Sequence, residues 1–307
     1  MPVLVAHGPV TYGLGRTFEE APLSLPPGAT SAVAVAERTT HTKWWREALT
    51  IALFYEVYSL ARNTQGSAST SPEHAFRNAR AVIRIEQAMG LYHEQSIQMF
   101  FLHAPAVVKV LNIYYGAAHF FVTTGVMIYL YLRHPDRYVR WRWILGATTA
   151  LALIGFITFP VMPPRLITSD FGQSGFVDTL HTIGGLWSFE SGPIAKLSNQ
   201  YAAMPSLHFA WSVWCALALW PRLRHRASRT LAVAHPVITL IGIVATANHF
   251  WLDAAAGLLV LGVGYVAGSW LATNVGSWHR EREAARVERR RPRQTVPPDE
   301  TMETADG

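Results

Sequence analysis

The chain has 307 residues, half of them hydrophobic and only 15 % charged, whereas soluble globular proteins carry about 25 % charged residues. The deficit lies in apolar runs of membrane-spanning length, which excludes an ordinary soluble domain. The formal net charge of +6 does not indicate a nucleic-acid partner, because the arginines gather in short loops and in the tail, where the positive-inside rule places them. The single cysteine, Cys215, cannot form an intramolecular disulfide.

The N-terminal part of the chain is expected to be irregular. Residues 1–42 are rich in Pro, Gly, Ala and Thr without a clear period, which predicts a disordered leader. No basic start is followed by an apolar core, so we expect no signal peptide. The first membrane span is predicted at residues 44–60, although Glu47 and Glu56 weaken it.

An amphipathic stretch follows at residues 71–101. Ser71-Pro72-Glu73 is typical of a helix start, and apolar residues then recur at roughly helical spacing among charged ones. We expect this segment to lie along the membrane surface as an interfacial helix.

Five further apolar runs complete a six-helix bundle. A polar loop of about forty residues separates the third span from the fourth and is long enough to be functional. We therefore predict an all-α, polytopic membrane domain over residues 43–276, followed by a charged tail at 277–307 that begins as a helix and ends disordered. The five predicted spans are 106–132, 143–162, 205–220, 231–246 and 252–275.

Arginines predict the orientation of these spans. The second and third spans are joined through Arg133, Arg137, Arg140 and Arg142, and the fourth and fifth through Arg222, Arg224, Arg226 and Arg229. Both connections and both termini are therefore expected on the cytoplasmic side. The 162–204 loop and His249 then fall on the outer side.

The first candidate for chemistry is the pair His249 and Asp253. If this stretch is helical, residues four apart lie on one face, one turn from each other. The carboxylate can then accept a hydrogen bond from one imidazole nitrogen and leave the other nitrogen free to react. The alternative is a polar pair that ties two helices together.

The second candidate is residues 203–208, at the outer end of the fourth span. Pro205 and Ser206 suit a helix start, and free N–H groups at such a start can bind a phosphate. His208 follows within the first turn and is expected at the same membrane depth as His249. Two histidines at one level on adjacent spans are less easily explained by packing alone.

Cationic and polar residues of the outer loops extend the predicted site. Arg165 follows Pro163-Pro164 on the outer side, where its guanidinium can clamp a phosphate through two hydrogen bonds; the alternative is an arginine that reaches the interface along its aliphatic stem. Glu94, Tyr201 and Lys196 are candidates for the substrate pocket. His103, His119, His181 and His235 have no evident partner, and we interpret them as structural.

These residues together predict one reaction. Two histidines, an orienting acid, a cation and a helix N-terminus are what phosphoryl transfer without a metal requires. One histidine attacks phosphorus and holds it covalently, and the other protonates the leaving oxygen.

Two motifs resemble signatures of the type-2 phosphatidic acid phosphatase superfamily. Ala-Met-Pro-Ser-Leu-His at 203–208 and Asn-His-Phe-Trp-Leu-Asp at 248–253 are similar to its second and third signatures. Pro-Pro-Arg at 163–165 and Gly-Leu-Tyr-His-Glu at 90–94 are similar to its inositolphosphotransferase branch, which includes inositol phosphorylceramide synthase and is related to sphingomyelin synthase. The resemblance covers about residues 45–275.

The resemblance implies a six-helix membrane fold in which His249 is the nucleophile, Asp253 orients it and His208 is the general acid. The chain departs from the phosphatase pattern at Ile243, where the third signature has arginine, and at Leu207, where the second has glycine. The first signature is not recognisable. Arg165 is therefore the expected phosphate clamp, with Ser206 beside it.

The sequence thus predicts a multi-pass enzyme of the cell membrane that acts on the outer face, through a phosphohistidine, on a phospholipid or an isoprenoid-linked phosphate. The enzyme is either a phosphotransferase of the inositolphosphotransferase type or a phosphatase, and no cofactor, metal or nucleic acid is expected. One alternative is a membrane metalloprotein with zinc on His208, His249 and Asp253. Another is a transporter or scaffold without enzymatic activity.

Overall fold

The computed structural model describes residues 70–167, 175–185 and 200–290, with a few residues between 44 and 56, and side chains as far as residue 275. The chain divides into two units, Met1–His41 and Thr42–Gly307, and the second unit contains everything described below. The predicted leader, most of the predicted first span and Lys196 lie outside the described residues. Within those residues every regular element is a helix, beside one isolated bridge between Val161 and Ala202.

Four helices are long and apolar enough to cross a membrane. They are α5 (Pro105–Arg133), α6 (Pro135–Thr158), α10 (Arg226–Ala245) and the part of α11 (Trp251–Arg290) that ends at Val275. Their outer faces expose large apolar side chains, among them Phe121, Leu231, Leu259 and Val266. Exposure of so much apolar surface to water is unfavourable, so the four helices are compatible with a multi-pass membrane protein.

The predicted fourth span is shorter than a membrane span. It corresponds to α9 (Leu207–Leu219), which has 13 residues, whereas a bilayer needs about 20. A 3-10 turn, η3 (Trp220–Arg222), follows before α10 begins. The sequence predicts a longer span because its apolar run also includes residues 205 and 206 and the 3-10 turn, which are not part of the helix.

The predicted third span begins earlier than expected. Pro135 and Asp136 start α6 directly after α5, because proline is favoured in the first helical turn and an acid complements the helix dipole there. Arg137, Arg140 and Arg142, expected in a loop, therefore lie on the first turns of α6. Arg140 donates hydrogen bonds to the Tyr265 hydroxyl at 2.9 Å and to Ser269 at 3.1 Å.

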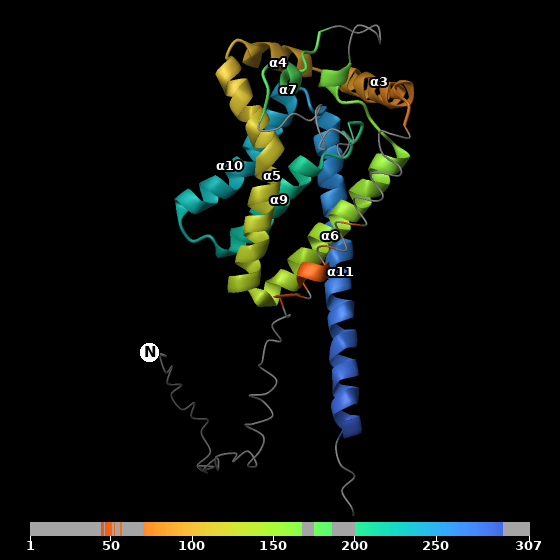
Figure 1. The fold of residues 1–307 in the computed structure, drawn as a ribbon, viewed down its shortest axis with the longest axis vertical. Helices are drawn as coiled ribbons and strands as arrows, with labels where there is room; N and C mark the ends of the chain where they lie inside the picture. Colours follow the sequence, from red (N-terminus) through yellow and green to blue (C-terminus); the bar gives the residue numbers. More distant parts are fainter. Residues whose placement is uncertain are drawn as a thin grey trace, which may run out of the picture. The chain divides into compact units, whose positions relative to one another are not determined.

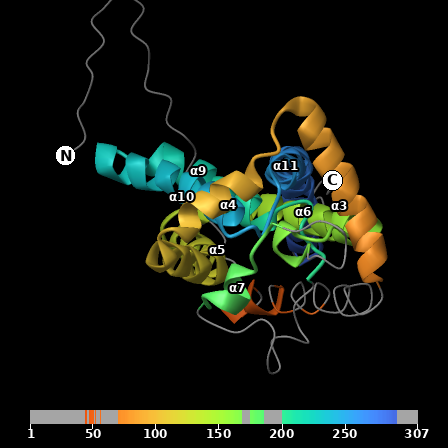
Figure 2. The ribbon, with the colours of Figure 1, turned by 90° about the horizontal axis from the view of Figure 1, so that it is seen from above.

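The amphipathic stretch forms two helices where one was expected. Ser71 caps α3 (Pro72–Met89), and Gly90, with φ of 69°, ends it in the left-handed conformation that glycine adopts without strain. The shorter α4 (Glu94–Leu102) follows. Figures 1 and 2 show α3 and α4 lying across one end of the long helices, the end at which α11 begins.

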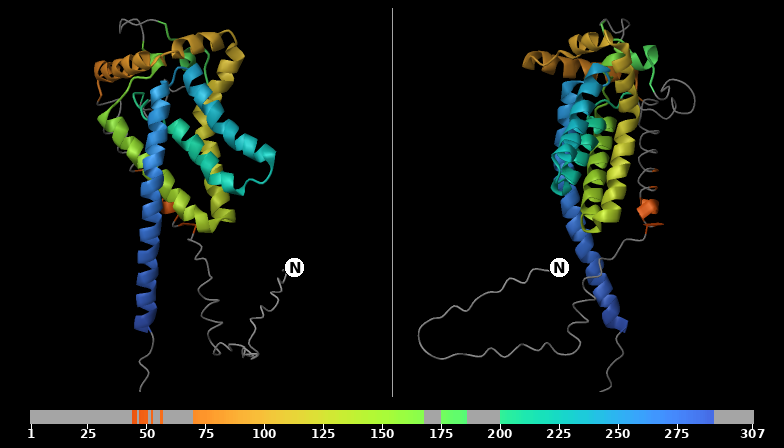
Figure 3. Two further views of the ribbon diagram at one scale, coloured as in Figure 1. Left: turned by 180° about the vertical axis from the view of Figure 1, so that it is seen from behind. Right: turned by 90° about the vertical axis from the view of Figure 1, so that its left-hand side faces the viewer.

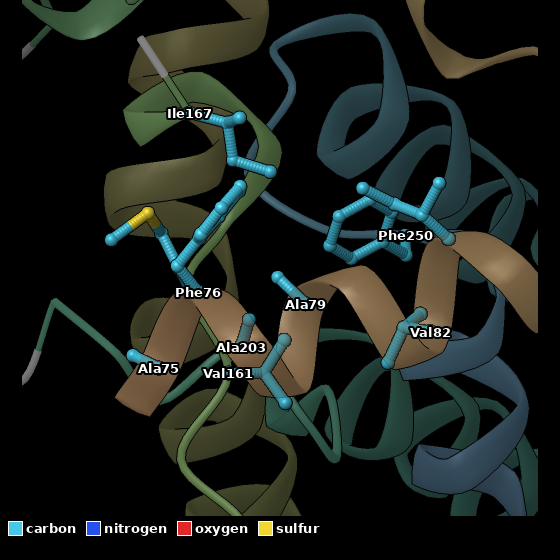
Figure 4. Close-up of a cluster of buried hydrophobic side chains, with 10 residues drawn as sticks. Ala75, Phe76, Ala79, Val82, Val161, Ile167, Ala203 and Phe250 are labelled. Atoms are coloured by element: carbon cyan, nitrogen blue, oxygen red, sulfur yellow. The ribbon is translucent and has the colours of Figure 1, made fainter. Parts of the chain in front are cut away.

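A hydrophobic cluster fastens α3 to this end of the bundle. Apolar side chains at helical spacing on α3 pack against residues from the loop that follows α6 and from the start of α11. We call this set of residues the α3 cluster. Figure 4 shows Ala75, Phe76, Ala79 and Val82 of α3 around Val161, Ile167, Ala203 and Phe250. The cluster brings four stretches of the chain to one place: α3, residues 161–167, Ala203 and Phe250.

Helices α6 and α11 cross each other (Figure 3), and their backbones come into close contact. A Cβ atom on Gly264 would lie 2.3 Å from Thr148 Oγ1, and one on Gly268 would lie 2.5 Å from the Ile144 Cα. Glycines four residues apart place both contacts on one face of α11, an arrangement that lets membrane helices approach closely.

We predict that Gly268→Ala weakens this contact. The added methyl group meets main-chain atoms that cannot rotate away, and such overpacking costs roughly 1–3 kcal/mol. Thermal unfolding of the purified protein in detergent should show a lower melting temperature. Gly262→Ala, on the same helix with nothing within 4 Å of the added Cβ, is the matched control. Equal melting temperatures for the two variants would contradict the packing argument.

Candidate active site

The turn between α10 and α11 carries His249. Ala247 adopts a φ of 52°, and the N–H groups of Ala247 and Asn248 return to the carbonyls of Val244 and Ile243 at 2.9 Å each. This pattern is a Schellman cap, in which glycine is the usual residue at the left-handed position. The sequence suggested one helix for His249 and Asp253, but His249 lies before the start of α11.

The ring of His249 is buried, with its two nitrogens in different environments. Nδ1 lies 2.8 Å from the Ala203 carbonyl and 3.3 Å from Asp253 Oδ2. Because both partners are acceptors, Nδ1 carries the proton. Nε2 is buried without a hydrogen-bond partner among the described residues, so its lone pair is available. The contact with Asp253 was predicted, but the shorter contact with Ala203 was not.

The start of α9 is fastened to the start of α11. The Ser206 N–H donates to the Asp253 carbonyl at 2.8 Å, and Ser206 Oγ caps α9 by accepting the Phe209 N–H at 3.4 Å. A side chain on Gly257 would meet the Ser206 carbonyl oxygen at 2.5 Å, so glycine permits the contact. As a result the rings of His208 and His249 lie 5.6 Å apart between centroids, as the shared membrane depth had predicted.

Three hydrogen bonds hold Arg165 beside this turn. It lies in the 3-10 turn η1 (Pro164–Leu166), and its N–H donates to the Ala247 carbonyl at 2.8 Å. Nε donates to Asn248 Oδ1 at 3.0 Å, and Nη1 donates to Asp178 Oδ2 at 2.7 Å. Nη2 makes no hydrogen bond within the part of the chain that the structure describes. The guanidinium is therefore fixed next to the residue that precedes His249.

Sequence reasoning missed Asn248 and Asp178 as partners of Arg165. Asn248 adjoins His249, so its place in the motif was the available signal. Asp178 caps the short helix α7 (Thr179–Thr182) by accepting the N–H groups of Leu180 and His181, and an aspartate before a helix is a common capping signal. Only the fold brings it to Arg165.

Two glutamates cover the N-terminus of α11. Glu94 Oε1 accepts the Trp251 N–H at 3.2 Å, and Glu86 Oε1 accepts the Leu252 N–H at 2.8 Å. Both side chains are fully buried, and sequence reasoning missed Glu86. Glu94, expected in a substrate pocket, is occupied in capping the helix that follows His249, where a carboxyl group also complements the helix dipole.

Glu86 and Glu94 lie close enough for their charges to interact. Their Oε2 atoms are buried and have no hydrogen-bond partner among the described residues, and a second acid nearby disfavours the ionised form of a buried carboxyl group. Burial, together with the neighbouring Glu94, raises the pKa of Glu86 to about 9. Glu86 is therefore protonated at neutral pH.

The remaining predicted pocket residue that the structure describes is Tyr201. It packs against the α3 cluster, and its carbonyl accepts the Val161 N–H at 2.8 Å. Burial raises the pKa of its hydroxyl group. Its position therefore supports the path of the loop next to Ala203, whose carbonyl holds His249.

A third histidine adjoins the pair. The ring of His119, on α5, lies 4.1 Å from that of His208, and the ring of Tyr115 stacks on His208 at the same distance. Sequence reasoning treated His119 as structural, since nothing on the sequence connects α5 to α9. Among the described residues no group of three His, Cys, Asp or Glu side chains converges closely enough to hold a metal ion, which gives the zinc alternative no support there.

Comparisons with known proteins point to one family. A family model described as the PAP2 superfamily matches residues 80–267, a range that includes both histidines, Asp253, Arg165 and the two capping glutamates. No curated protein and no solved structure matches the chain.

We predict that Glu86 makes the stability of the protein depend on pH. The folded protein keeps the Glu86 proton up to about pH 9, whereas the unfolded chain loses it near the ordinary value of 4.5. The folded state therefore binds more protons between these values, and its free energy of unfolding falls as the pH rises through this range. Thermal unfolding of the protein in detergent between pH 5 and pH 9 measures this fall.

The variant Glu86→Gln keeps an uncharged acceptor for the Leu252 N–H, so its melting temperature should fall less over the same range. Glu73→Gln, at an exposed position in the first turn of the same helix, should behave like the parent. A parent and a Glu86→Gln variant with the same pH dependence would show that Glu86 is not held in its protonated form by the fold.

Proposed function

The chain belongs to the PAP2 superfamily, and on this premise we propose that it is a membrane enzyme that transfers the phosphate-bearing group of a lipid phosphoester through a phosphohistidine on His249. Membership supports an enzyme of the phosphatase type. The single observation that carries the finer proposal is the state of His249: one nitrogen is held by two acceptors, the other is buried with no hydrogen-bond partner among the described residues, and the ring lies close to that of a second histidine.

In the first step the His249 Nε2 lone pair attacks phosphorus, and the bond from phosphorus to the leaving oxygen breaks. His208 gives its proton to that oxygen, so the lipid alcohol departs neutral. The Ala203 carbonyl and Asp253 keep the Nδ1 proton in place and stabilise the positive charge that develops on the ring. The product is a phosphohistidine and a neutral His208.

In the second step His208 removes a proton from the acceptor hydroxyl, whose oxygen attacks phosphorus. The phosphorus–nitrogen bond breaks, and its electron pair returns to His249 Nε2. His208 thus recovers the proton that it gave away, and the enzyme is ready for another turnover without any cofactor. Water as acceptor gives a phosphatase, and an alcohol gives a transferase.

Charge on the phosphoryl oxygens is stabilised by Arg165 and by the start of α9. Arg165 keeps Nη2 for this purpose while its other groups hold Asn248 and Asp178. The N–H groups of Leu207 and His208 belong to the first turn after Ser206, where helical N–H groups lack intrahelical partners and favour anions.

The motifs favour a phosphotransferase of the inositolphosphotransferase type over a simple phosphatase. Ile243 stands where the phosphatases have a second cation, so fewer cations would be available to hold a phosphate monoester dianion. A phosphodiester donor, such as a phospholipid with a polyol head group, carries one negative charge and needs fewer. An isoprenoid-linked phosphate is the second donor class.

The arginines favour a site on the outer face of the cell membrane. The connections from α5 to α6 and from α9 to α10 lie toward the end of the helices opposite α3, α4 and α7 (Figures 1 and 3). Arginines on cytoplasmic connections would place the histidine pair outside and both termini inside.

A labelling experiment distinguishes the two activities. Membranes that contain the protein receive labelled phosphatidic acid, phosphatidylinositol or an isoprenyl phosphate, with and without free inositol. Free phosphate identifies a hydrolase, and a new phospholipid identifies a transferase. Turnover that a chelator abolishes, with stoichiometric zinc in the purified protein, would favour the metalloprotein, and no turnover of any lipid would favour a transporter or scaffold.

We predict that His249→Ala abolishes turnover and the acid-labile phosphoenzyme, because no other group replaces the nucleophile. Asp253→Asn should lower kcat by roughly 10²-fold or more without unfolding the protein, since Asn retains an acceptor for the Phe250 N–H and the Asp253 carbonyl still accepts from Ser206. Turnover of lipid phosphate and trapping of labelled protein measure both effects.

Asp136→Asn, an exposed aspartate at the start of α6, is the control and should leave the rate unchanged. If the His249→Ala protein turned over lipid phosphate at the parental rate, the assignment of the nucleophile would be wrong.

A further inference from the structure

Acids outnumber Arg165 at its end of the bundle. Arg165 is the one arginine or lysine that is buried in the described parts of the chain. Four carboxyl groups lie around the start of α11 and the turn before it: Glu86, Glu94, Asp178 and Asp253. Carboxyl groups therefore exceed cations there even when Glu86 is protonated.

Asp178 uses both of its carboxylate oxygens. Oδ2 accepts a hydrogen bond from Arg165 Nη1 at 2.7 Å, and Oδ1 accepts the N–H groups of Leu180 and His181 at 3.1 and 3.3 Å. The first contact compensates the charge of the guanidinium, and the second holds the carboxylate in place. Turning Asp178 away from Arg165 would therefore uncap α7.

The segment that carries Asp178 is anchored on both sides. Before it, the Val177 N–H donates to Gln98 Oε1 of α4 at 2.9 Å, and Gln98 Nε2 donates back to the Val177 carbonyl at 2.7 Å. After it, Thr179 Oγ1 donates to Asn112 Oδ1 of α5 at 3.1 Å, and Asn112 Nδ2 donates to the Thr179 carbonyl at 2.9 Å. The side chains of Gln98, Asn112 and Thr179 are buried, so an incoming substrate meets the Asp178 carboxylate in a fixed place.

An arginine paired with a carboxylate holds a second anion less strongly than a free arginine does. Nε of Arg165 is occupied by Asn248 and Nη1 by Asp178, which leaves Nη2 for a ligand. An anion bound there is attracted by the guanidinium and repelled by the carboxylate on its far side. Repulsion between like charges grows in proportion to the charge of the ligand, so a dianion loses twice as much binding free energy to Asp178 as a monoanion does.

We propose that Asp178 is a specificity-determining residue: by compensating the charge of Arg165, it makes the site prefer phosphodiesters, with one negative charge, to phosphate monoesters, with two. The role rests on the proposed function, in which Arg165 holds the phosphoryl oxygens. It adds to the effect of Ile243, which leaves out a cation, because Asp178 offsets a cation that is present. The preferred donor is then a phospholipid diester rather than phosphatidic acid or an isoprenyl monophosphate.

Two small anions that differ by one methyl group test the proposal without turnover. Methyl phosphate is a monoester whose second pKa lies at about 6, so it is a dianion at pH 8, whereas dimethyl phosphate is a monoanion throughout. The affinity for each anion is obtained from the rise in melting temperature of the full-length protein in detergent, at constant ionic strength. Measurements at pH 8 and pH 5 isolate the effect of the second charge.

At pH 8 the parent should bind dimethyl phosphate at least as tightly as methyl phosphate. In Asp178→Asn the ratio of the two affinities should shift about tenfold toward methyl phosphate, as expected when one unit charge a few ångströms away is removed from a partly screened site. At pH 5 both ligands are monoanions, so the ratio should be the same in the two proteins, whatever the charge of the histidines.

The variants separate the charge of Asp178 from its role in the fold. Asn suits the test because its side-chain oxygen can still cap α7, and Asp178→Glu, which keeps the charge, should keep the parental preference. The matched control is Asp136→Asn, which removes a carboxylate from the start of α6, toward the other end of the helices, and should leave the ratio unchanged. If Asp178→Asn does not fold, Asp178→Ser takes its place, since serine also caps helices without a charge.

Turnover provides the second measurement. With labelled lipids of matched acyl chains at pH 8, kcat/KM of the parent should be higher for phosphatidylinositol than for phosphatidic acid. Asp178→Asn should raise the relative value for phosphatidic acid about tenfold, mainly through a lower KM, by the same electrostatic argument. If Asp178 only oriented Arg165, the variant would instead lose activity on both lipids alike.

Equal affinity ratios at pH 8 in the parent and in the folded, uncharged variant would overturn the proposal. A uniform loss of affinity for both anions, or no binding of either anion to the variant, would overturn it as well. Failure of the phosphohistidine assignment is recognised separately, by turnover in His249→Ala, and does not alter the affinity ratios. A shift of the ratio in a protein that turns over no lipid would support the charge selectivity and contradict the proposed enzyme.

Discussion

The structure depends on the buried N-terminus of α11. Its first N–H groups need acceptors, and in an apolar setting each unmet group costs free energy. Asp253, Glu94 and Glu86 supply these acceptors for Phe250, Trp251 and Leu252 in turn. Two of these acids lie on α3 and α4. Their hydrogen bonds to the start of α11 therefore also hold α3 and α4 across this end of the bundle, and His249 lies immediately before α11.

Charge at this end is balanced locally. Three carboxyl groups meet there, and the protonation of Glu86 removes one negative charge. Arg165 is paired with Asp178 and faces the turn from the other side. His249 thus lies between Asn248, which Arg165 holds, and Asp253, which bonds its Nδ1 and the Phe250 N–H.

Close backbone contact lets the helices bring these groups together. Gly257 admits the start of α9, while Gly264 and Gly268 admit α6, so α11 packs with little side-chain filling between it and its neighbours. The same helix is therefore apolar enough to cross a membrane, packs closely against α6 and α9, and begins directly after the turn that carries His249. A rigid element of this kind suits a site that must hold two imidazoles at one distance.

The sequence alone determined the apolar helices, the motifs around His208 and His249, and the contact of His249 with Asp253, because hydrophobic period and short spacings are local properties. Helix ends were less certain: α9 is shorter and α6 longer than predicted, since capping and packing set them. Only the tertiary structure decided that Ala203, Asn248, Asp178, Glu86 and His119 join the site. Each of them meets its partner from another segment, and no local pattern records which buried donor will face which acceptor.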